Sequence, residues 1–394
     1  MSRPDLLQRL AASTAERERA QLLRRLRTVE HADGPWLEIG GRRLLSFCSN
    51  DYLGLARHPQ LIDALIRTAQ EEGVGSASAH LICGHRAEHA ELEEALAVWT
   101  GRERALLFSS GYMANLGVLQ ALLGPGDVCV QDKLNHACLL DGAKLSGAEF
   151  KRYPHADVAA ARRQLDARPD AVALLATDGV FSMDGDVAPL RELAALCADA
   201  QATLMVDDAH GFGVLGPHGS GTVNAAGLGQ QQVPVLMATL GKALGCAGAF
   251  VAGPAALIEG LLQFARPYIY TTAMPPALAA AALEAVQLAQ TETWRRAKLA
   301  ALITRFRRGA GELGLPLLAS SSAIQPLLLG SAAATLAAAQ ALEQHGLLVT
   351  AIRAPTVPAG QARLRITLSA AHETAHVDQL LGALESLHWP GHSS

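Results

Sequence analysis

The chain has 394 residues, half of them hydrophobic, which is enough to bury a sizeable core and more than a single core usually holds. Its formal net charge is −4, the pI is near 6.4, and charges of both signs are mixed along the chain, so nothing favours a nucleic-acid or anionic-membrane partner. We therefore expect one large and one smaller domain that act on a small molecule.

The N-terminal 30 residues alternate charges with Leu and Ala at helical spacing, which predicts an N-terminal helical segment (residues 1–50) and not a signal peptide. No run reaches the ~18 apolar residues that a membrane span requires. The six cysteines are scattered, never spaced as C-x-x-C, and mostly lie in apolar surroundings. We interpret them as buried free thiols in a reducing cytoplasm.

From about residue 86 to residue 208, helical patterns alternate with short apolar runs, as in βαβ units around a buried parallel sheet. Helices are expected at 90–99, 114–123, 158–167 and 190–200. Strands are expected at 105–110, 127–132, 171–179, 203–209, 233–240 and 249–253. The fold class is therefore α/β, and we assign residues 51–275 to a large domain.

After Tyr270 the pattern changes to one or two long helices, too long for an ordinary crossover. Strands are then expected at 324–330, 347–353 and 363–369, interleaved with helices at 331–345 and 373–387. We assign residues 276–394 to this long helix and a smaller C-terminal α/β domain.

Two segments place reactive side chains at the ends of apolar strands, where they reach the crevice beside a parallel sheet. Asp207 and His210 follow one strand, and Thr239 and Lys242 end the next. Alone, a strand-end Asp is usually a cap and a strand-end Lys a solvated charge. Pyridoxal 5′-phosphate (PLP) requires both a Schiff-base lysine and an acid that faces its pyridine nitrogen. The pair therefore predicts a PLP site.

The whole chain resembles a known family, the α-oxoamine synthases among the fold-type I PLP enzymes. The matching segments, in the family's order, are FCSNDYLGL (47–55), FSSGYMAN (108–115), NHACLLDGAKLS (135–146), DGVFSMDGD (178–186), DDAHGFGVLG (207–216), TLGKALG (239–245) and RAPTVPAGQARLRITLSAAH (353–372). This resemblance implies a large, mostly parallel sheet domain flanked by helices, a smaller C-terminal α/β domain, and active sites built across a homodimer interface.

The resemblance also implies roles for residues around PLP. Lys242 holds the cofactor as a Schiff base and then removes the substrate Cα proton, while Asp207 keeps the pyridine nitrogen protonated. His136 stacks on the ring, and His210 and Ser182 donate hydrogen bonds near the phenolic oxygen and the substrate. Without the family match, purely structural roles would explain these last three residues: a helix cap, a histidine in a turn and a serine in a loop.

The cofactor's phosphate and the substrates complete the implied site. Gly111 and Tyr112 precede a helix, where free N–H groups and the macrodipole favour an anion, and the Thr239 hydroxyl is a further donor. Five residues are implied to bind substrate: Arg353 and Asn50 at the amino-acid carboxylate, His136 beside the cofactor ring, and Arg24 and Thr356 elsewhere. Thr271 and Thr272 are candidates for the partner's phosphate, although a plain loop explains them equally well.

The ending at 354–365 is most similar to the biotin-pathway branch of the family. That branch joins L-alanine to a pimeloyl thioester, carried on coenzyme A (pimeloyl-CoA) or on an acyl carrier protein, and releases CO₂. A sibling synthase joining glycine to acetyl-CoA is the alternative, and the same ending disfavours an aminotransferase. A PLP-binding regulatory protein without turnover would keep Lys242 and Asp207 without needing Arg353, which is present.

Three further signals do not change this interpretation. Residues 211–216 satisfy G-x-G-x-x-G, but a turn-rich stretch follows instead of a helix, so a dinucleotide site is disfavoured. Residues 85–89 satisfy H-x-x-E-H, the inverted zinc-protease pattern, yet we expect a solvated helix face and no metal. Residues 77–80 depart from the family's glycine- and arginine-containing loop, which we expect to border the cofactor or substrate entrance.

Overall fold

The computed structural model describes residues 3–20 and 22–387, and its centre is a seven-stranded sheet. In spatial order the strands are β4 (Arg104–Phe108), β10 (Ala249–Gly253), β9 (Val235–Thr239), β8 (Thr203–Asp207), β7 (Ala173–Asp178), β5 (Val128–Asp132) and β6 (Glu149–Tyr153). Only β10 runs against its neighbours. The central strands are almost wholly buried, as expected for a parallel sheet covered on both faces.

Alternate residues of each strand point to opposite faces of the sheet, and each face has its own core. Cys129 and Met205 pack on one side with α4 (Gly111–Leu122), α5 (Ala137–Ser146) and α9 (Ala255–Phe264). Val130 and Val206 pack on the other side with α6 (Val158–Asp166) and α7 (Leu190–Asp199). Side chains of each strand thus alternate between two buried faces, and helices cover both.

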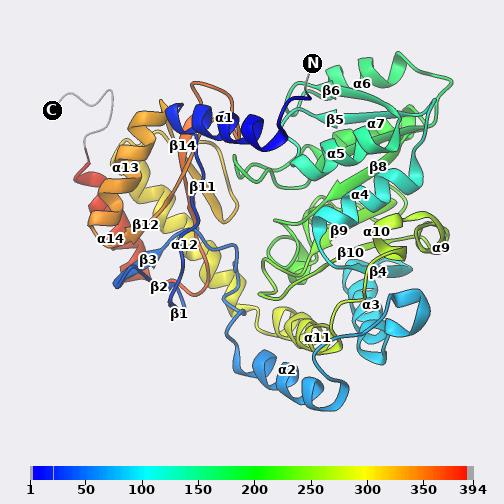
Figure 1. Cartoon of the computed structure of the whole chain (residues 1–394), viewed down its shortest axis with the longest axis horizontal. Coiled ribbons are helices and arrows are strands. Elements are labelled where there is room, and N and C mark those ends of the chain that lie inside the picture. The colour runs from blue at the N-terminus through cyan, green and yellow to red at the C-terminus, as the bar shows by residue number, and fades with distance from the viewer. Residues whose placement is uncertain (1–2, 21, 388–394) are drawn as a thin grey trace.

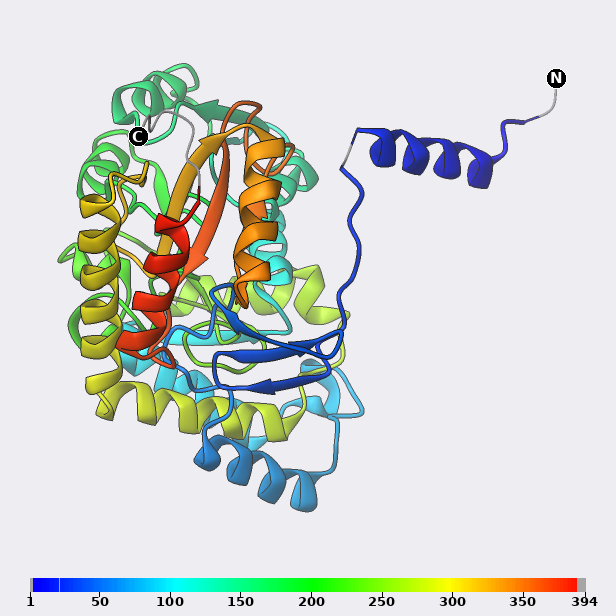
Figure 2. The ribbon, with the colours of Figure 1, turned by 90° about the vertical axis from the view of Figure 1, so that its left-hand side faces the viewer.

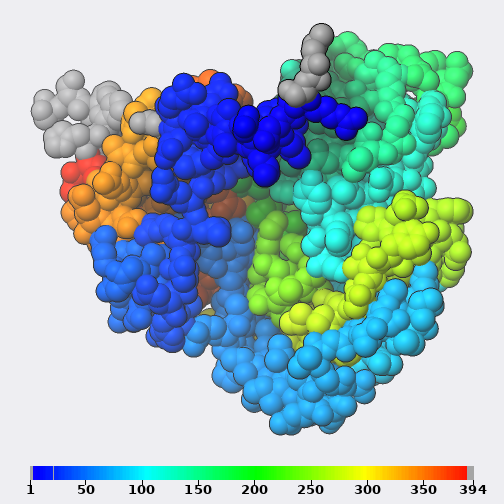
Figure 3. Space-filling model, in the orientation of Figure 1, coloured from blue at the N-terminus to red at the C-terminus, as the bar shows by residue number. Residues whose placement is uncertain are grey.

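Two helices lead from this sheet to the C-terminal part, which lies beside it in Figure 1: α11 (Pro276–Thr291) and α12 (Trp294–Glu312). The C-terminal sheet is antiparallel, in the order β11 (Ile324–Gly330), β14 (Ala362–Thr367) and β13 (Thr350–Ile352). It is accompanied by α13 (Ala332–Gln344) and α14 (Thr374–Glu385). Figure 3 shows that the face toward the viewer is hollowed between the two parts.

The N-terminal segment differs from the expected helical one. After α1 (Leu6–Arg19) come three strands, β1 (His31–Asp33), β2 (Trp36–Ile39) and β3 (Arg42–Ser46), and β12 (Leu347–Leu348) extends their sheet. The helical prediction is therefore wrong for residues 31–46, because an antiparallel pairing with short turns overrides the helical pattern. Helix α1 stands away from the rest of the chain, and no residue in it is buried (Figure 2).

The remaining helices are α2 (Pro59–Glu72), η1 (His80–Gly84), α3 (Ala87–Thr100), η2 (Pro217–Gly219), α8 (Thr222–Ala225) and α10 (Arg266–Ile269). The helices and strands expected from residue 86 onward are confirmed, with ends shifted by a few residues, except one. The single strand expected at 347–353 is instead two short strands, β12 and β13, which belong to different sheets. The assignment of 1–50, 51–275 and 276–394 to separate domains stays a prediction. In the part of the chain that the structure describes, no helix has the length and apolarity of a membrane span.

All six cysteines are free, but not all are buried: Cys83 is exposed, and Cys48 and Cys246 are half-buried. The expectation of uniformly buried thiols is wrong for these three, because their segments are loops or turns at the surface of the core.

Candidate active site

Three parallel strands of the large sheet end in an aspartate: Asp132 on β5, Asp178 on β7 and Asp207 on β8. The carboxyl ends of these strands lie at one edge of the sheet, which is where ligands bind in open α/β folds. The sheet therefore brings acidic groups together with the residues that follow β9, including Lys242.

A cavity of about 220 Å³ opens at this edge of the sheet. Eight predicted site residues line it, which brings together groups separated by up to 131 positions (242 minus 111) along the chain. The lining residues are Gly111, Tyr112, His136, Cys138, Asp178, Ser182, Asp207, Ala209, His210, Met237, Thr239 and Lys242. The predicted neighbourhood of Lys242 and Asp207 is therefore confirmed as a shared cavity.

Asp207 is held in place by two donors. Its Oδ2 accepts a hydrogen bond from Asn115 Nδ2 at 2.7 Å, and its Oδ1 accepts from the Ala209 N–H at 3.0 Å. The carboxylate is almost buried, at 5 % relative exposure, so these bonds fix both its position and its rotation. Asn115, on α4, is a positioning residue that the sequence reasoning missed.

Lys242 ends a chain of hydrogen-bonding groups. Its Nζ lies 2.9 Å from His210 Nε2, and His210 Nδ1 lies 2.6 Å from the Tyr52 hydroxyl. Burial lowers the pKa of Lys242, although the charges of Asp207 and Asp178 oppose this, and burial also lowers the pKa of His210 well below its ordinary value. A neutral His210 and a lysine that loses its proton readily suit a group that must act as nucleophile and base.

His136 is the N-cap of α5, as expected from the NHA motif. Its backbone N–H donates to Asp178 Oδ2 at 2.9 Å, and its Nδ1 lies 2.8 Å from Cys138 Sγ. Burial lowers the pKa of the imidazole, while burial and the nearby Asp207 raise the pKa of Asp178 well above its ordinary value. The ring is thus fixed at the cavity wall in a predominantly neutral form, as a stacking platform requires.

The N-terminus of α4 also lines the cavity. Gly111 and Tyr112 are its first two residues, and their N–H groups lack intrahelical acceptors, whereas Ser110 Oγ accepts from the Met113 N–H. Thr239 Oγ1 donates to the Gly248 carbonyl at 2.9 Å and accepts from the Gly241 N–H. A helix N-terminus at the cavity suits a phosphate.

Of the five predicted substrate residues, His136 lines this cavity and the other four do not. Asn50 is closest to it, since its Oδ1 accepts from both the Tyr52 hydroxyl and Arg365 Nη2. Arg353 is half-buried, and its carbonyl accepts from the N–H of the exposed Thr356. Arg24 is exposed in the stretch between α1 and β1. Their substrate roles therefore stay predictions, as do those of Thr271 and Thr272.

The cavity fits PLP by its donor set. It combines one primary amine, a buried carboxylate held by two donors, a fixed imidazole and a helix N-terminus. These are the groups that an aldehyde, a pyridine nitrogen, an aromatic ring and a phosphate require.

Comparison with known proteins agrees with this geometry. Residues 42–384 match the family model of class I and II aminotransferases. The 8-amino-7-oxononanoate synthase of Cellvibrio japonicus is 57% identical over 377 residues, which cover 96% of this chain and 95% of that protein. The chain belongs to the 8-amino-7-oxononanoate synthase family.

Solved structures show the same fold. The serine palmitoyltransferase from S. paucimobilis with a bound PLP–myriocin aldimine is 29% identical, with a TM-score of 0.92 over 97% of this chain and 98% of that one. The 8-amino-7-oxononanoate synthase from Francisella tularensis is 33% identical, with a TM-score of 0.76 over 87% and 97% of the respective chains. The fold-type I assignment is therefore confirmed.

The two rejected motifs and the variant loop at 77–80 agree with expectation only in part. The glycine motif at 211–216 leads into η2 and the four-residue α8, so it has no helix of the dinucleotide-binding kind. In the H-x-x-E-H motif, however, the expectation of a solvated helix face is wrong. His85 precedes α3, and His89 is fully buried, where the Met274 carbonyl satisfies its ring N–H. The loop at 77–80 lines no part of the cavity and pairs with Thr272 instead.

His155 connects two loops near the active site by hydrogen bonds to Asp132 and Asp186. Its Nδ1 lies 3.1 Å from Asp132 Oδ1 and its Nε2 lies 2.8 Å from Asp186 Oδ2. Burial alone would lower the pKa of His155, but the hydrogen bonds and charges of the two carboxylates outweigh it and raise the pKa to about 10. The unfolded value is near 6.5, so the stabilisation is fully present below pH 6.5 and is lost as pH rises through 10.

Replacing His155 with Gln is therefore expected to lower the free energy of unfolding by about 2 kcal/mol at pH 6, because charge-assisted hydrogen bonds are lost. The difference from the wild type should shrink as pH approaches 10. Urea unfolding at pH 6, 8 and 10 measures it. A difference that grows with pH would show that the bridge does not depend on a charged imidazole.

Proposed function

We propose that this chain catalyses the decarboxylative condensation of L-alanine with a pimeloyl thioester, giving 8-amino-7-oxononanoate, CO₂ and the free thiol. One observation carries the proposal: in a chain 57% identical to a protein of that name, Lys242 and Asp207 face one cavity with the other cofactor residues. The cofactor is PLP, and the acyl group arrives on coenzyme A or on an acyl carrier protein.

PLP, when bound, supplies an electron sink for the pair of electrons left at the substrate Cα. Lys242 would hold the cofactor through its Nζ and, once free, would take the Cα proton on the same nitrogen. Its lowered pKa increases the neutral fraction that this step needs. His210, 2.9 Å away, orients Nζ and connects it to the Tyr52 hydroxyl.

Asp207 would hold a proton on the pyridine nitrogen, since a fixed carboxylate stabilises that cation. His136 would pack on the ring face and limit its tilt. The N-terminus of α4, with Gly111 and Tyr112, would bind the phosphate. Ser182, on the cavity wall, would donate a hydrogen bond on the substrate side.

The substrate contacts rest on the resemblance alone. Arg353 would bind the α-carboxylate of alanine, because the planar guanidinium matches a carboxylate in two hydrogen bonds, and Asn50 would orient it. Arg24 and Thr356 would contact the acyl donor. We also propose a homodimer in which Thr271 and Thr272 reach the partner's phosphate, and a cytoplasmic location, with which six free cysteines agree.

A matrix of substrates tests this proposal. Purified, PLP-loaded protein is incubated with alanine or glycine against pimeloyl-, succinyl- and acetyl-CoA, and thiol release and the mass of the aminoketone are measured. We expect the highest kcat/KM for alanine with pimeloyl-CoA. One methyl group is worth only ~1 to 3 kcal/mol of discrimination, so the acyl chain should discriminate more strongly than the amino acid.

Two outcomes would change the assignment. The highest kcat/KM for glycine with acetyl-CoA would identify the sibling synthase and leave the PLP chemistry in place. Thiol release from a pimeloyl-acyl carrier protein alone would change only the carrier.

A further inference from the structure

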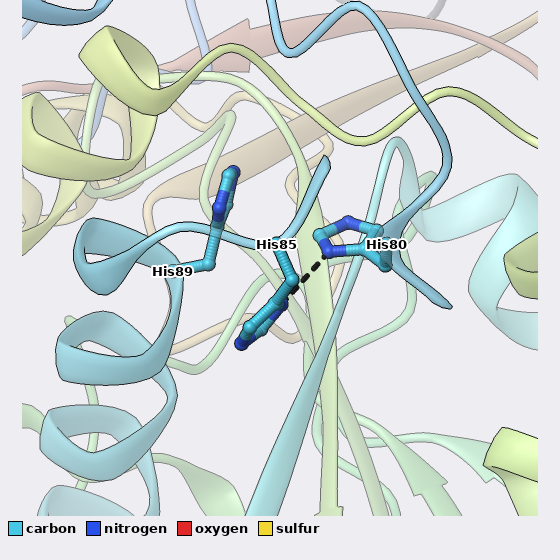
Figure 4. A group of neighbouring side chains, drawn as sticks. All are labelled: His80, His85 and His89. Atoms are coloured by element: carbon cyan, nitrogen blue, oxygen red, sulfur yellow. Dashed lines mark hydrogen bonds between the residues drawn. The ribbon is translucent and has the colours of Figure 1, made fainter. Parts of the chain in front are cut away.

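Three histidines meet outside the active-site cavity, at the turn η1 and the start of α3 (Figure 4). His80 begins η1, His85 lies between η1 and α3, and His89 is in the first turn of α3. Each offers one ring nitrogen, and the three nitrogens lie within 4.8 Å of one another. None of the three lines the cavity that holds Lys242.

We propose that His80, His85 and His89 form a binding site for a divalent transition-metal ion of the zinc type. The Nδ1 atoms of His80 and His85 lie 3.0 Å apart. Two nitrogens bound to one tetrahedral Zn²⁺ at about 2.05 Å are roughly 3.3 Å apart, so this pair needs only a small movement to share an ion. The proton in this hydrogen bond would move to Nε2 of the ring that carries it as the metal binds, so that each ring stays neutral and offers Nδ1 to the ion.

The electrostatic surroundings suit imidazole ligands, which must be neutral to bind a metal. Burial and the neighbouring imidazoles lower the pKa of His80 to about 3. Burial, and to a smaller extent His89, lowers the pKa of His85. Burial also lowers the pKa of His89; the charge of Arg86 lowers it further, and the charge of Glu88 raises it in part. All three rings are therefore neutral at pH 7.

A second layer of acceptors is present behind the ligands. His85 Nε2 lies 3.9 Å from Glu93 Oε2, and His89 Nε2 lies 2.8 Å from the Met274 carbonyl. A ligating histidine normally directs its other N–H to a carboxylate or carbonyl, which fixes the tautomer. Burial raises the pKa of Glu93 to about 7, and a nearby cation would favour its charged form.

His89 would be the weakest of the three ligands. Its Nδ1, which carries the lone pair when Nε2–H faces Met274, already accepts from the Arg86 N–H at 2.9 Å. The ion must displace that helix-capping bond, at a cost of about 1 kcal/mol. The pair His80 and His85 is therefore expected to dominate the affinity.

The three proposed ligands pack against a segment that is distant in sequence. The His80 ring stacks on Tyr268 at 4.9 Å between centroids, and Ala79 pairs with Thr272. The Met274 carbonyl also accepts from Ser76 Oγ. A bound ion would fix residues 80–85 against the start of α3, next to the segment 268–274, which is a structural role and not a catalytic one.

Zinc titration tests the site. Tag-free, PLP-loaded protein is stripped with a chelator, and Zn²⁺ binding is measured by isothermal titration calorimetry, with Co²⁺ visible absorption as a reporter of tetrahedral nitrogen coordination. We expect one saturable equivalent, a rise in Tm with Zn²⁺, and at least ~10-fold weaker binding for His80→Gln and for His85→Gln. His31→Gln, at an exposed position in β1, is the matched control and should bind as the wild type does.

Wild-type affinity for Zn²⁺ in the His80→Gln/His85→Gln double variant would overturn the proposal. It would also be overturned if the wild-type protein showed no Co²⁺ band, or if its band persisted in the double variant. Both variants change rings that are half-buried or exposed, so loss of folding is not expected and circular dichroism checks it. The readout is metal binding and not turnover, so its failure is distinguishable from failure of the proposed synthase activity.

Discussion

Replacing Lys242 with alanine is expected to abolish covalent attachment of PLP and to lower kcat/KM at least ~10³-fold, because one nitrogen serves both as anchor and as base. The side chain is half-buried and contacts His210, so its truncation leaves the core intact. Absorbance of the bound cofactor and the thiol-release assay measure the two effects.

Lys133→Ala is the control, because Lys133 is exposed after β5 and does not line the cavity. It should retain both the cofactor and the activity. A Lys242→Ala enzyme with more than a tenth of the wild-type kcat/KM would show that another base removes the Cα proton.

Replacing Asp207 with asparagine is expected to leave PLP binding in place but to lower kcat roughly 10²- to 10³-fold, because a neutral amide cannot hold the pyridinium proton. The structure accommodates the change: Asn115 Oδ1 has no hydrogen-bond partner, so a rotated Asn115 amide can accept from the new side chain. Exchange of the alanine α-proton into D₂O measures the effect on the step itself.

Asp208→Asn is the matched control, since Asp208 is equally buried but accepts from the N–H and hydroxyl of Thr222, away from the cavity. It should lower stability without slowing exchange. Wild-type exchange in the Asp207→Asn enzyme would contradict the electron-sink role assigned to Asp207.

Most of the large sheet could be predicted because its strands are buried on both faces and therefore appear as short apolar runs, as 127–132 and 203–209 do. β6 was not expected, since the edge strand EFKRY is only partly buried and charged residues interrupt its apolar ones. The strands between residues 31 and 46 were also missed. Their pairing depends on register with one another and with β12, some 300 positions away, which local periodicity does not encode.

The cofactor residues could be predicted because strand ends converge at one sheet edge, and the family resemblance supplied their roles. The residues that position them were missed. Asn115 meets Asp207 from 92 positions away, and Tyr52 meets His210 from 158 positions away, contacts that only the fold creates. His89 was misjudged for the same reason, since its burial depends on the distant Met274 carbonyl.

Borohydride reduction of the PLP-loaded protein, followed by peptide mapping, tests most directly the claim that Lys242 is the cofactor lysine opposite Asp207. We expect the reduced cofactor on the peptide that contains Lys242 and on no other. Cofactor fixed instead at Lys133, Lys144, Lys151 or Lys298 would contradict it.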